Sequence, residues 1–449
     1  MTFRKKEMEM SRIVIIALLF VAPVISVFAQ DFVQDSAQDF TQNNSQNGAD
    51  SSANTSEFIQ ALKGGKKSGD INLLFDFNHN SRTPPKNNSY LATSFGLYYK
   101  SAFYGYFRLH LGFRGALALW EQSRKVQISD GKGGKGSAAQ DFWDNNIAMI
   151  ARSYLEYFDG DTSIKAGRIE DKTDMIDKHF DGVWISNKSA GWLLVDVIYL
   201  NQVGRVLDRE LSGFEKFTRW DKAVNGTPHK IGNSRFGGAY YLGLTFELFE
   251  WLKLKAYGLT SPEIYSFVAG KIDINTTYFL LNAGFVGGFE HKNGIVRTQN
   301  DGHWSYLAHA DMGGKYESQW GQFYATMGYR GTEHSGGIGS LKYTGNSFNP
   351  FFYFSGTALE KAKALHLVYG KLGFKVDFLD IYLAYGYNFF KGNLERKGST
   401  NNAQGEVNFY MDWRFSEWTS VIISLLNTHG AKNGVPNNTR FDFMFKVSL

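Results

Sequence analysis

The most regular feature of this chain is a two-residue alternation of apolar and polar side chains. It is clearest in the stretch 104–120, where one face would carry Phe107, Leu109, Leu111, Phe113, Leu117 and Leu119, and the other Arg108, His110, Gly112 and Arg114. Successive side chains of a β-strand point to opposite faces, whereas a helix would not separate these residues. The stretches 233–248 and 404–415 repeat the pattern. The chain is therefore predicted to consist of strands with one apolar and one polar face.

The same alternation predicts eighteen strands. They are expected near 69–79, 89–100, 104–120, 145–157, 162–168, 183–188, 192–202, 233–248, 251–259, 264–274, 277–290, 303–317, 320–330, 363–376, 380–389, 404–415, 418–427 and 439–449. Eight short turns alternate with nine connections that are mostly long, among them 121–144, 203–232 and 331–362. Short turns at one end and long loops at the other are typical of transmembrane barrels, and a soluble sandwich has no reason to show them.

The last predicted strand also favours a closed barrel. It runs to the final residue, Leu449, and carries Phe441, Phe443, Phe445, Val447 and Leu449 on one face. A terminal strand of this kind pairs with the first strand and leaves no open edge. We therefore expect an all-β fold, a transmembrane antiparallel β-barrel of 18 strands with short periplasmic turns and long external loops.

Composition fits this class and excludes others. Aromatic residues make up 16% of the chain, charged residues 20%, and there are 48 glycines and no cysteine. The absence of cysteine excludes disulfides, a cysteine nucleophile and thiolate metal sites. A formal net charge of +5 is too small and too scattered to favour nucleic acid. Aromatic residues such as Trp251, Trp320 and Trp418 fall beside the short turns, where barrels carry interfacial girdles.

The N-terminus reads as an export signal. Basic residues precede an apolar run from Ile13 to Val27, and Val27-Phe28-Ala29 is a small-x-small cleavage pattern. The alternative, a membrane anchor, is less favoured because a spanning helix needs about 20 apolar residues. We expect a signal peptide at 1–29, a polar and disordered periplasmic segment at 30–66 with one helical turn near 58–67, and the barrel at 67–449.

Charged residues within the strands are expected to face the lumen, because a charge on the lipid face costs roughly 2–4 kcal/mol at mid-depth. By parity the inward bases, and candidate pore-lining residues, are Arg108, Arg114, Arg152, Arg235, Lys253, Lys255, Lys315, Arg330 and Arg414. The inward acids are Glu156, Asp196, Asp311 and Asp412. A water-filled lumen also accommodates charges that play no part in transport, so each base has a purely structural alternative.

The stretch Gly167 to Ser189 places a charged loop between two short predicted strands. Its acids are Glu170, Asp171, Asp174, Asp177 and Asp181. Their spacing matches neither an EF-hand nor a His-x-x-x-His motif, so no metal is expected. His110, His303, His309 and His366 lie in no nucleophile motif, and the glycine pairs follow no phosphate-loop spacing. We therefore expect neither an enzyme nor a bound cofactor.

Two motifs resemble a known family. Ala61 to Asp70, leading into the strand from Ile71, looks like the start of OprD-type porins. Gly167-Arg168-Ile169-Glu170, followed by Asp177 to Val183, is similar to their third-loop signature, with the Helicobacter-type Hof branch nearest. The resemblance implies a barrel of eighteen strands that passes small solutes, with its third external loop folded inward and basic side chains along the wall.

The predicted function is that of an outer-membrane porin, through which small hydrophilic solutes, including carboxylate-bearing ones, diffuse past a charged constriction. The alternative is a surface adhesin or interaction barrel that uses the loops 203–232 and 331–362, in which aromatic residues such as Phe214, Phe217 and Trp220 would be exposed hot spots. The expected partners are outer-membrane lipid, small hydrophilic solutes and, during biogenesis, the barrel-assembly machinery. The oligomeric state is left open between monomer and homotrimer.

Overall fold

A computed structural model describes residues 51–80, 86–121, 148–221, 229–233, 237–291, 304–332, 363–391, 401–430 and 437–449. The chain comprises two units, Met1–Gln60 and Ala61–Leu449, and the second is the barrel. The predicted signal peptide at 1–29 and most of the predicted loop 331–362 lie outside the described residues. A helix, α2 (Ser51–Lys63), is longer than the single turn expected near 58–67. Among the described residues, no helix is long and apolar enough to span a membrane.

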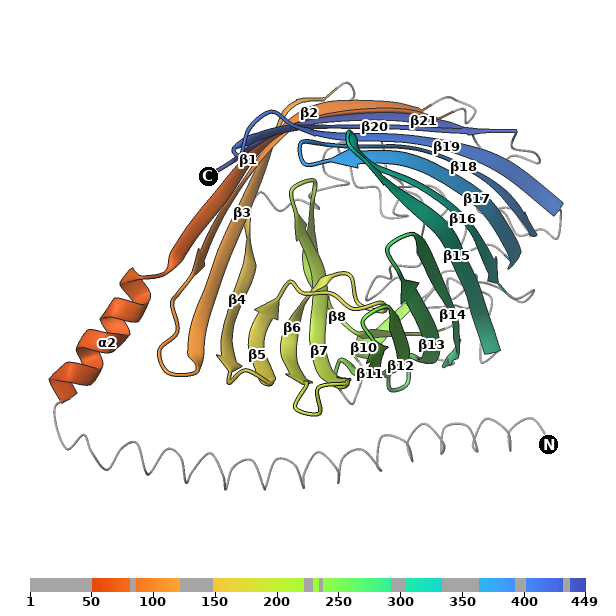
Figure 1. The fold of residues 1–449 in the computed structure, drawn as a ribbon. Coiled ribbons are helices and arrows are strands. Elements are labelled where there is room, and N and C mark those ends of the chain that lie inside the picture. The colour runs from red at the N-terminus through yellow and green to blue at the C-terminus, as the bar shows by residue number, and fades with distance from the viewer. Residues whose placement is uncertain are drawn as a thin grey trace, which may run out of the picture. The chain divides into compact units, whose positions relative to one another are not determined.

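The barrel is closed by eighteen antiparallel strands, as the alternation predicts (Figure 1). They are β1 (Lys66–Asn80), β2 (Lys86–Lys100), β3 (Phe107–Glu121), β4 (Ala148–Phe158), β5 (Thr162–Ile169), β6 (His179–Asn187), β7 (Leu193–Leu207), β11 (Ala239–Phe249), β12 (Leu252–Ser261), β13 (Tyr265–Asn275), β14 (Phe279–Glu290), β15 (Trp304–Ser318), β16 (Gly321–Thr332), β17 (Lys363–Val376), β18 (Leu379–Lys391), β19 (Asn401–Arg414), β20 (Thr419–His429) and β21 (Asn438–Ser448).

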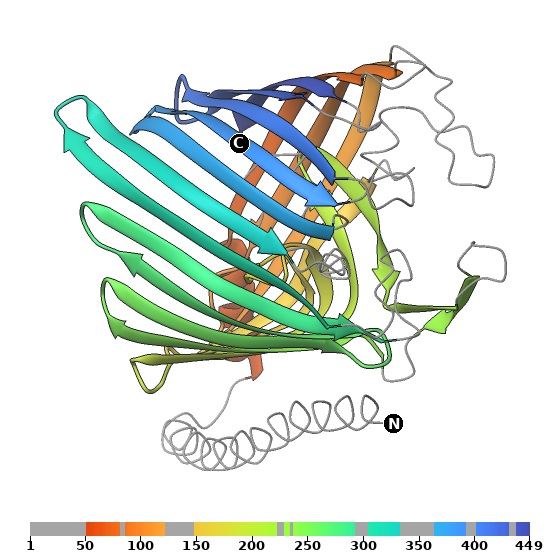
Figure 2. The ribbon, with the colours of Figure 1, turned by 90° about the vertical axis from the view of Figure 1, so that its right-hand side faces the viewer.

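Each strand pairs with its neighbours in sequence order, and the ring closes where β1 pairs with β21. At this seam the backbone groups of Gly69 and Leu449 exchange two hydrogen bonds, of 3.1 and 2.8 Å. The last strand therefore has no free edge, as a barrel in lipid requires. Figure 2 shows the strands running obliquely across the wall, the tilt that barrel closure imposes.

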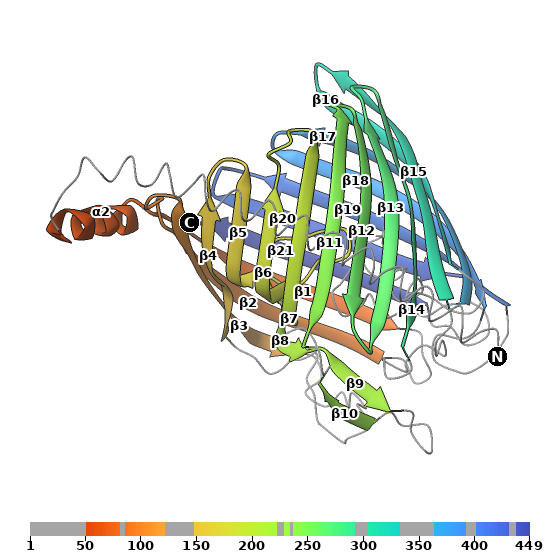
Figure 3. The ribbon, with the colours of Figure 1, turned by 90° about the horizontal axis from the view of Figure 1, so that it is seen from below.

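Three additional strands lie within the segment predicted as one long external loop, 203–232. They are β8 (Glu210–Lys216), β9 (Thr218–Asp221) and β10 (His229–Asn233). β8 pairs back on the end of β7, whereas β9 and β10 form a separate two-stranded sheet that extends away from the wall (Figure 3). The alternation in this segment is too short to have predicted them.

Short turns gather at one end of the barrel, and they carry exposed aromatic side chains. The turns span 101–106, 159–161, 188–192, 250–251, 276–278, 319–320, 377–378 and 415–418. Within these turns, Tyr278 is 71% exposed, Trp320 70% and Trp418 60%. Large apolar side chains, such as Leu117 and Leu372, are exposed along the outer face of the strands. An apolar band bordered by aromatic rings is the surface that a barrel presents to a bilayer.

Candidate functional site

The connection between β5 and β6, residues 170–178, folds into the barrel. Met175 and Ile176 at its centre are fully buried, and they belong to one apolar cluster with Tyr241 and Tyr257. These tyrosines face inward, since Tyr240, next in sequence to Tyr241, is exposed on the outer face. The inward fold of this third loop is therefore anchored by apolar contacts with β11 and β12. Its flanking strands, β5 and β6, are the shortest in the barrel, so the loop begins below the rim.

Asp174, at the tip of this loop, bridges two wall lysines. Its carboxylate lies 3.4 Å from Lys255 Nζ on β12 and 3.2 Å from Lys271 Nζ on β13. Asp273 lies 3.5 Å from both ammonium groups. Lys255 and Lys271 are 81 and 97 positions away from Asp174 along the chain. Two carboxylates and two ammonium groups therefore form a compact, charge-balanced cluster inside the barrel.

The other acids of the loop also meet bases. Glu170 lies 2.5 Å from Arg152 on β4, and Asp171 lies 2.5 Å from Lys165 on β5. Asp177 lies 3.1 Å from Arg205 near the end of β7. All of these side chains are partly exposed, so each pair by itself contributes little to stability. Together they set the position of the loop against three neighbouring strands.

Asp181, predicted with the loop acids, lies on β6 and on the opposite face. Its carboxylate accepts hydrogen bonds of 2.7 and 2.9 Å from Arg168 and another from Gln202. The neighbouring residue, Phe180, faces the interior cluster, so Asp181 must face away from it. The structure begins β6 at His179 instead of near 183, and this difference moves Asp181 from the predicted loop to a strand.

A second segment enters the lumen, the hairpin of β7 and β8 (Figure 1). Val206 and Leu211 are buried in a cluster with Leu74 and Met444, which lie on the far side of the barrel. Ser94 Oγ donates a 2.6 Å hydrogen bond to the backbone oxygen at the turn of this hairpin, and Arg209 Nη1 lies 3.9 Å from Asp442. The hairpin therefore spans the lumen from β7 to β21.

This packing differs from the exposed surface that an interaction loop would require. Phe217 is 1% exposed and belongs to the interior cluster, and the Phe214 ring centroid lies 3.6 Å from Arg168 Cζ. Of the described aromatic side chains in the segment 203–232, these two are thus packed against the barrel instead of displayed. The side chain of Trp220 and the aromatic residues at 348–354 lie outside the described part of the chain.

Most of the predicted wall bases are paired with carboxylates. Arg108 donates hydrogen bonds of 2.5 and 2.9 Å to Glu156. Arg114 forms an ion pair with Asp70, and Arg330 forms one with Asp311, each at 2.6 Å. Lys253 lies 2.5 Å from Glu247. Arg414 is exposed at the last position of β19, and Arg235 lies outside the described residues. The bases therefore occur as a series of ion pairs around the wall, and not as a row of bare cations.

The remaining charged residues predicted to face inward make local contacts. Asp196 accepts a 2.8 Å hydrogen bond from Trp184 Nε1, and Lys315 donates one of 2.5 Å to Asn275. Asp412 is the cross-strand partner of Asp380. None of these three contacts reaches an inward-folded segment.

Sequence reasoning missed a set of inward tyrosines, Tyr324, Tyr382 and Tyr410, together with Lys371. We call these four residues the tyrosine wall. They lie on β16, β18, β19 and β17, and each is half-buried. Lys371 Nζ lies 3.8 Å from the ring centroid of Tyr382 and 5.4 Å from that of Tyr324. Their inward parity could have been read from the alternation, but their proximity could not, because 86 positions separate the first from the last.

Searches with the sequence alone found no relative: no family model matches the chain, and no curated protein matches it. The fold does match solved structures. Acinetobacter baumannii OccAB4 aligns with a TM-score of 0.65 and 12% identity over 86% of this chain and 98% of that one. Pseudomonas aeruginosa OccK3 (OpdO) aligns with a TM-score of 0.66 and 10% identity over 87% and 97%. Pseudomonas aeruginosa OpdQ aligns with a TM-score of 0.62 and 12% identity over 87% and 99%.

The matched structures belong to the OprD/Occ-type porins, the family that the sequence motifs resemble. The narrower resemblance to the Hof branch stays a prediction. Identities of 10–12% establish the fold and leave the transported solute to be argued from this chain's own residues. The chain therefore has the eighteen-stranded barrel fold of the OprD/Occ-type porins.

Proposed function

We propose that this protein is an outer-membrane porin through which small hydrophilic solutes, including carboxylate-bearing ones, diffuse past a charged constriction. The observation that carries the proposal is the inward fold of two segments within a closed barrel. The third loop covers the wall at β11 to β13, and the β7–β8 hairpin covers the wall at β1 to β3 and β21. On β16 to β19 the side chains of the tyrosine wall stay half-exposed, whereas inner residues farther from the short turns, such as Leu367 and Asn388, are buried. The half-exposed side chains support a narrow aqueous passage beside the tyrosine wall.

The cluster around Asp174 supports the selectivity part of the proposal. Lys255 and Lys271 each share their ammonium group between Asp174 and Asp273, and the four N–O distances of 3.2–3.5 Å are longer than those of the other loop ion pairs. A solute carboxylate can exchange with Asp174 for the same two donors. Such an exchange between Asp174 and a solute carboxylate at low energetic cost suits a channel. Binding of the solute must be favourable enough for it to enter and weak enough for it to be released.

The same proposal covers targeting. The predicted signal peptide at 1–29 would export the chain, and the aromatic-bordered apolar band would place the barrel in the outer membrane. Barrel-assembly machinery would insert it, and the functional unit would be one barrel or a homotrimer.

Conductance tests the proposal. Purified, folded protein in a planar bilayer is expected to give ohmic single-channel currents, and liposomes that contain it are expected to swell in amino acids and dicarboxylates. Replacing both lysines, Lys255→Met with Lys271→Met, leaves two acids unbalanced and is expected to shift the reversal potential toward cation preference. The absence of ohmic channels contradicts the proposal. A channel that already prefers cations, with dicarboxylates excluded, contradicts its selectivity part.

A further inference from the structure

The tyrosine wall is built on one row of directly paired residues across four strands. Tyr324 on β16 pairs with Gly373 on β17, Gly373 with Tyr382 on β18, and Tyr382 with Tyr410 on β19. Residues directly opposite each other in antiparallel strands share a face, so the whole row points into the lumen. A side chain at Gly373 would overlap the Tyr324 ring, so glycine there lets this ring lie across β17. The Tyr324 hydroxyl thereby reaches β18, where it donates a 3.1 Å hydrogen bond to Asp380.

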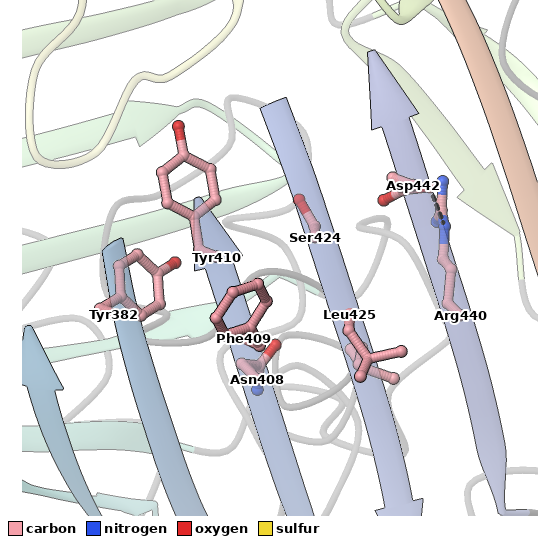
Figure 4. Close-up of a pocket in the computed structure, with 9 residues that line it drawn as sticks. Tyr382, Asn408, Phe409, Tyr410, Ser424, Leu425, Arg440 and Asp442 are labelled. Carbon is pink, nitrogen blue, oxygen red and sulfur yellow. Dashed lines mark hydrogen bonds and ion pairs between the residues drawn. The ribbon is translucent and has the colours of Figure 1, made fainter. Parts of the chain in front are cut away.

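The ammonium group of Lys371 lies on this row as a cation held by aromatic rings. Its Nζ is 3.8 Å from the ring centroid of Tyr382 and 5.4 Å from that of Tyr324. Tyr382 in turn stacks with Tyr410, with centroids 5.0 Å apart and planes 18° apart (Figure 4). Among the residues that the structure describes, no carboxylate forms an ion pair with Lys371. The negative faces of the rings, and not a carboxylate, therefore hold this cation in place.

Two carboxylates lie beside the rings, on the side of the short turns. Asp380 and Asp412 are two positions from Tyr382 and Tyr410 along β18 and β19, so they share the inner face, and they pair directly with each other. Both are partly exposed, and neither forms an ion pair with a described residue. Lys375, the other cross-strand partner of Asp380, is exposed and makes no ion pair with it either. Like charges directly opposite each other repel, and a cation bound between them relieves the repulsion.

An ammonium group that arrives from the lumen can exchange with that of Lys371 at low energetic cost. Lys371 breaks no ion pair when it moves, because only rings hold it, and its flexible stem lets its own ammonium group turn into water. The arriving group gains the ring contact that Lys371 gives up, and it can also reach the two carboxylates. An anion in the same place would face these carboxylates and the negative ring faces. The wall therefore favours a cation in the position that the Lys371 ammonium occupies.

We propose that the tyrosine wall binds the ammonium group of a primary organic amine. The ammonium group of the solute takes the place of the Lys371 ammonium on Tyr382, and the carboxylates of Asp380 and Asp412 accept its hydrogen bonds. The carbon chain of the solute extends into the lumen, so the site requires no closed cavity. The inference rests on the proposed porin function and names a second solute class, bound at a different part of the wall from the Asp174 cluster.

Block of single-channel current by three related solutes tests the site. n-Butylammonium, which reproduces the side chain of lysine, is expected to lower the conductance of the unmodified protein saturably in planar bilayers, whereas 1-butanol and butyrate are not. Asp380→Asn is expected to raise the half-blocking concentration of butylammonium roughly two- to tenfold, because a charged acceptor is lost. Tyr382→Leu should raise it by a similar factor, roughly two- to tenfold, because the ring face is lost. Lys371→Met should instead lower it, also roughly two- to tenfold, because the competing ammonium group is gone while the stem remains.

Asp161→Asn is the matched control for Asp380→Asn, since Asp161 is an exposed acid of the turn between β4 and β5, and it should leave the block unchanged. Equal effects of butylammonium and 1-butanol on the unmodified protein overturn the site, as does a butylammonium block that Asp380→Asn does not weaken. Saturable block by butyrate that Lys371→Met abolishes, without block by butylammonium, also overturns it, in favour of an anion site at Lys371. The absence of ohmic channels would instead overturn the proposed function, so the two failures are distinguishable.

Discussion

A chain that lacks residues 171–178 is expected to form a channel of higher single-channel conductance than the full chain. These residues connect the ends of β5 and β6, and their central pair, Met175 and Ile176, is buried inside the barrel. Their removal would clear the wall at β11 and β12 and release Lys255 and Lys271 from Asp174. Clearing the wall widens the passage. Releasing the two lysines raises the local concentration of anions in it. Single-channel recordings in planar bilayers at high and low salt would measure the change.

Two point variants separate the steric effect from the electrostatic one. Asp174→Asn keeps the loop and removes its bridging charge, so it should shift ion selectivity toward anions with a smaller change in conductance. Asp161→Asn removes an acid of the turn between β4 and β5, at the other end of the barrel, and should change neither. A deletion variant that folds but conducts like the full chain would show that the loop does not limit the passage.

Arg440→Met is expected to destabilise the barrel by about 3–5 kcal/mol. Arg440 forms ion pairs with both Asp76 and Asp442, which are opposite each other where the first and last strands pair. The side chains of all three residues are less than a tenth exposed. Without the guanidinium, two buried carboxylates would face each other at the seam that closes the barrel. Urea unfolding in detergent micelles, followed by the shift between folded and unfolded mobility in electrophoresis, would measure the loss.

Two further variants test the cause of that loss. Adding Asp76→Asn and Asp442→Asn to Arg440→Met removes the unpaired charges and is expected to restore most of the stability. Lys188→Met breaks an ion pair with Glu247 whose lysine is 46% exposed, and this change should cost at most about 1 kcal/mol. If Arg440→Met were as mild as Lys188→Met, the ion pairs at the seam would not hold it closed.

The sequence predicted the architecture because the lipid-exposed face of each strand must be apolar along its whole length. The prediction at 104–120 corresponds to β3 (Phe107–Glu121), and the one at 363–376 coincides with β17. The short turns can also be predicted from the sequence, because only a few residues separate one alternating stretch from the next. Strand order follows at once, since every strand pairs with its neighbour along the chain.

Irregularities within a strand and contacts across the lumen could not be predicted from the sequence. Asp181 pairs with Gln202 and Gly182 with Leu200, so β7 contains one extra residue that changes the face of its later residues. The part of the β7–β8 hairpin that enters the lumen, where Gln202–Leu207 pair with β8, has no lipid-facing side, so the alternation that marks the wall strands does not apply to it. Parity places Arg330 on the inner wall but cannot say that Asp311, on the neighbouring strand, neutralises it.

The most direct test of an open, water-filled passage along β16 to β19 uses the absence of cysteine from the chain. Lys371→Cys places one thiol on the inner wall, and Leu372→Cys places one on the outer face, where Leu372 is 66% exposed. A charged, water-soluble thiol reagent is expected to lower the single-channel conductance of the Lys371→Cys protein and to leave that of the Leu372→Cys protein unchanged. An unchanged conductance in the first variant, or a drop only in the second, would contradict a passage along these strands.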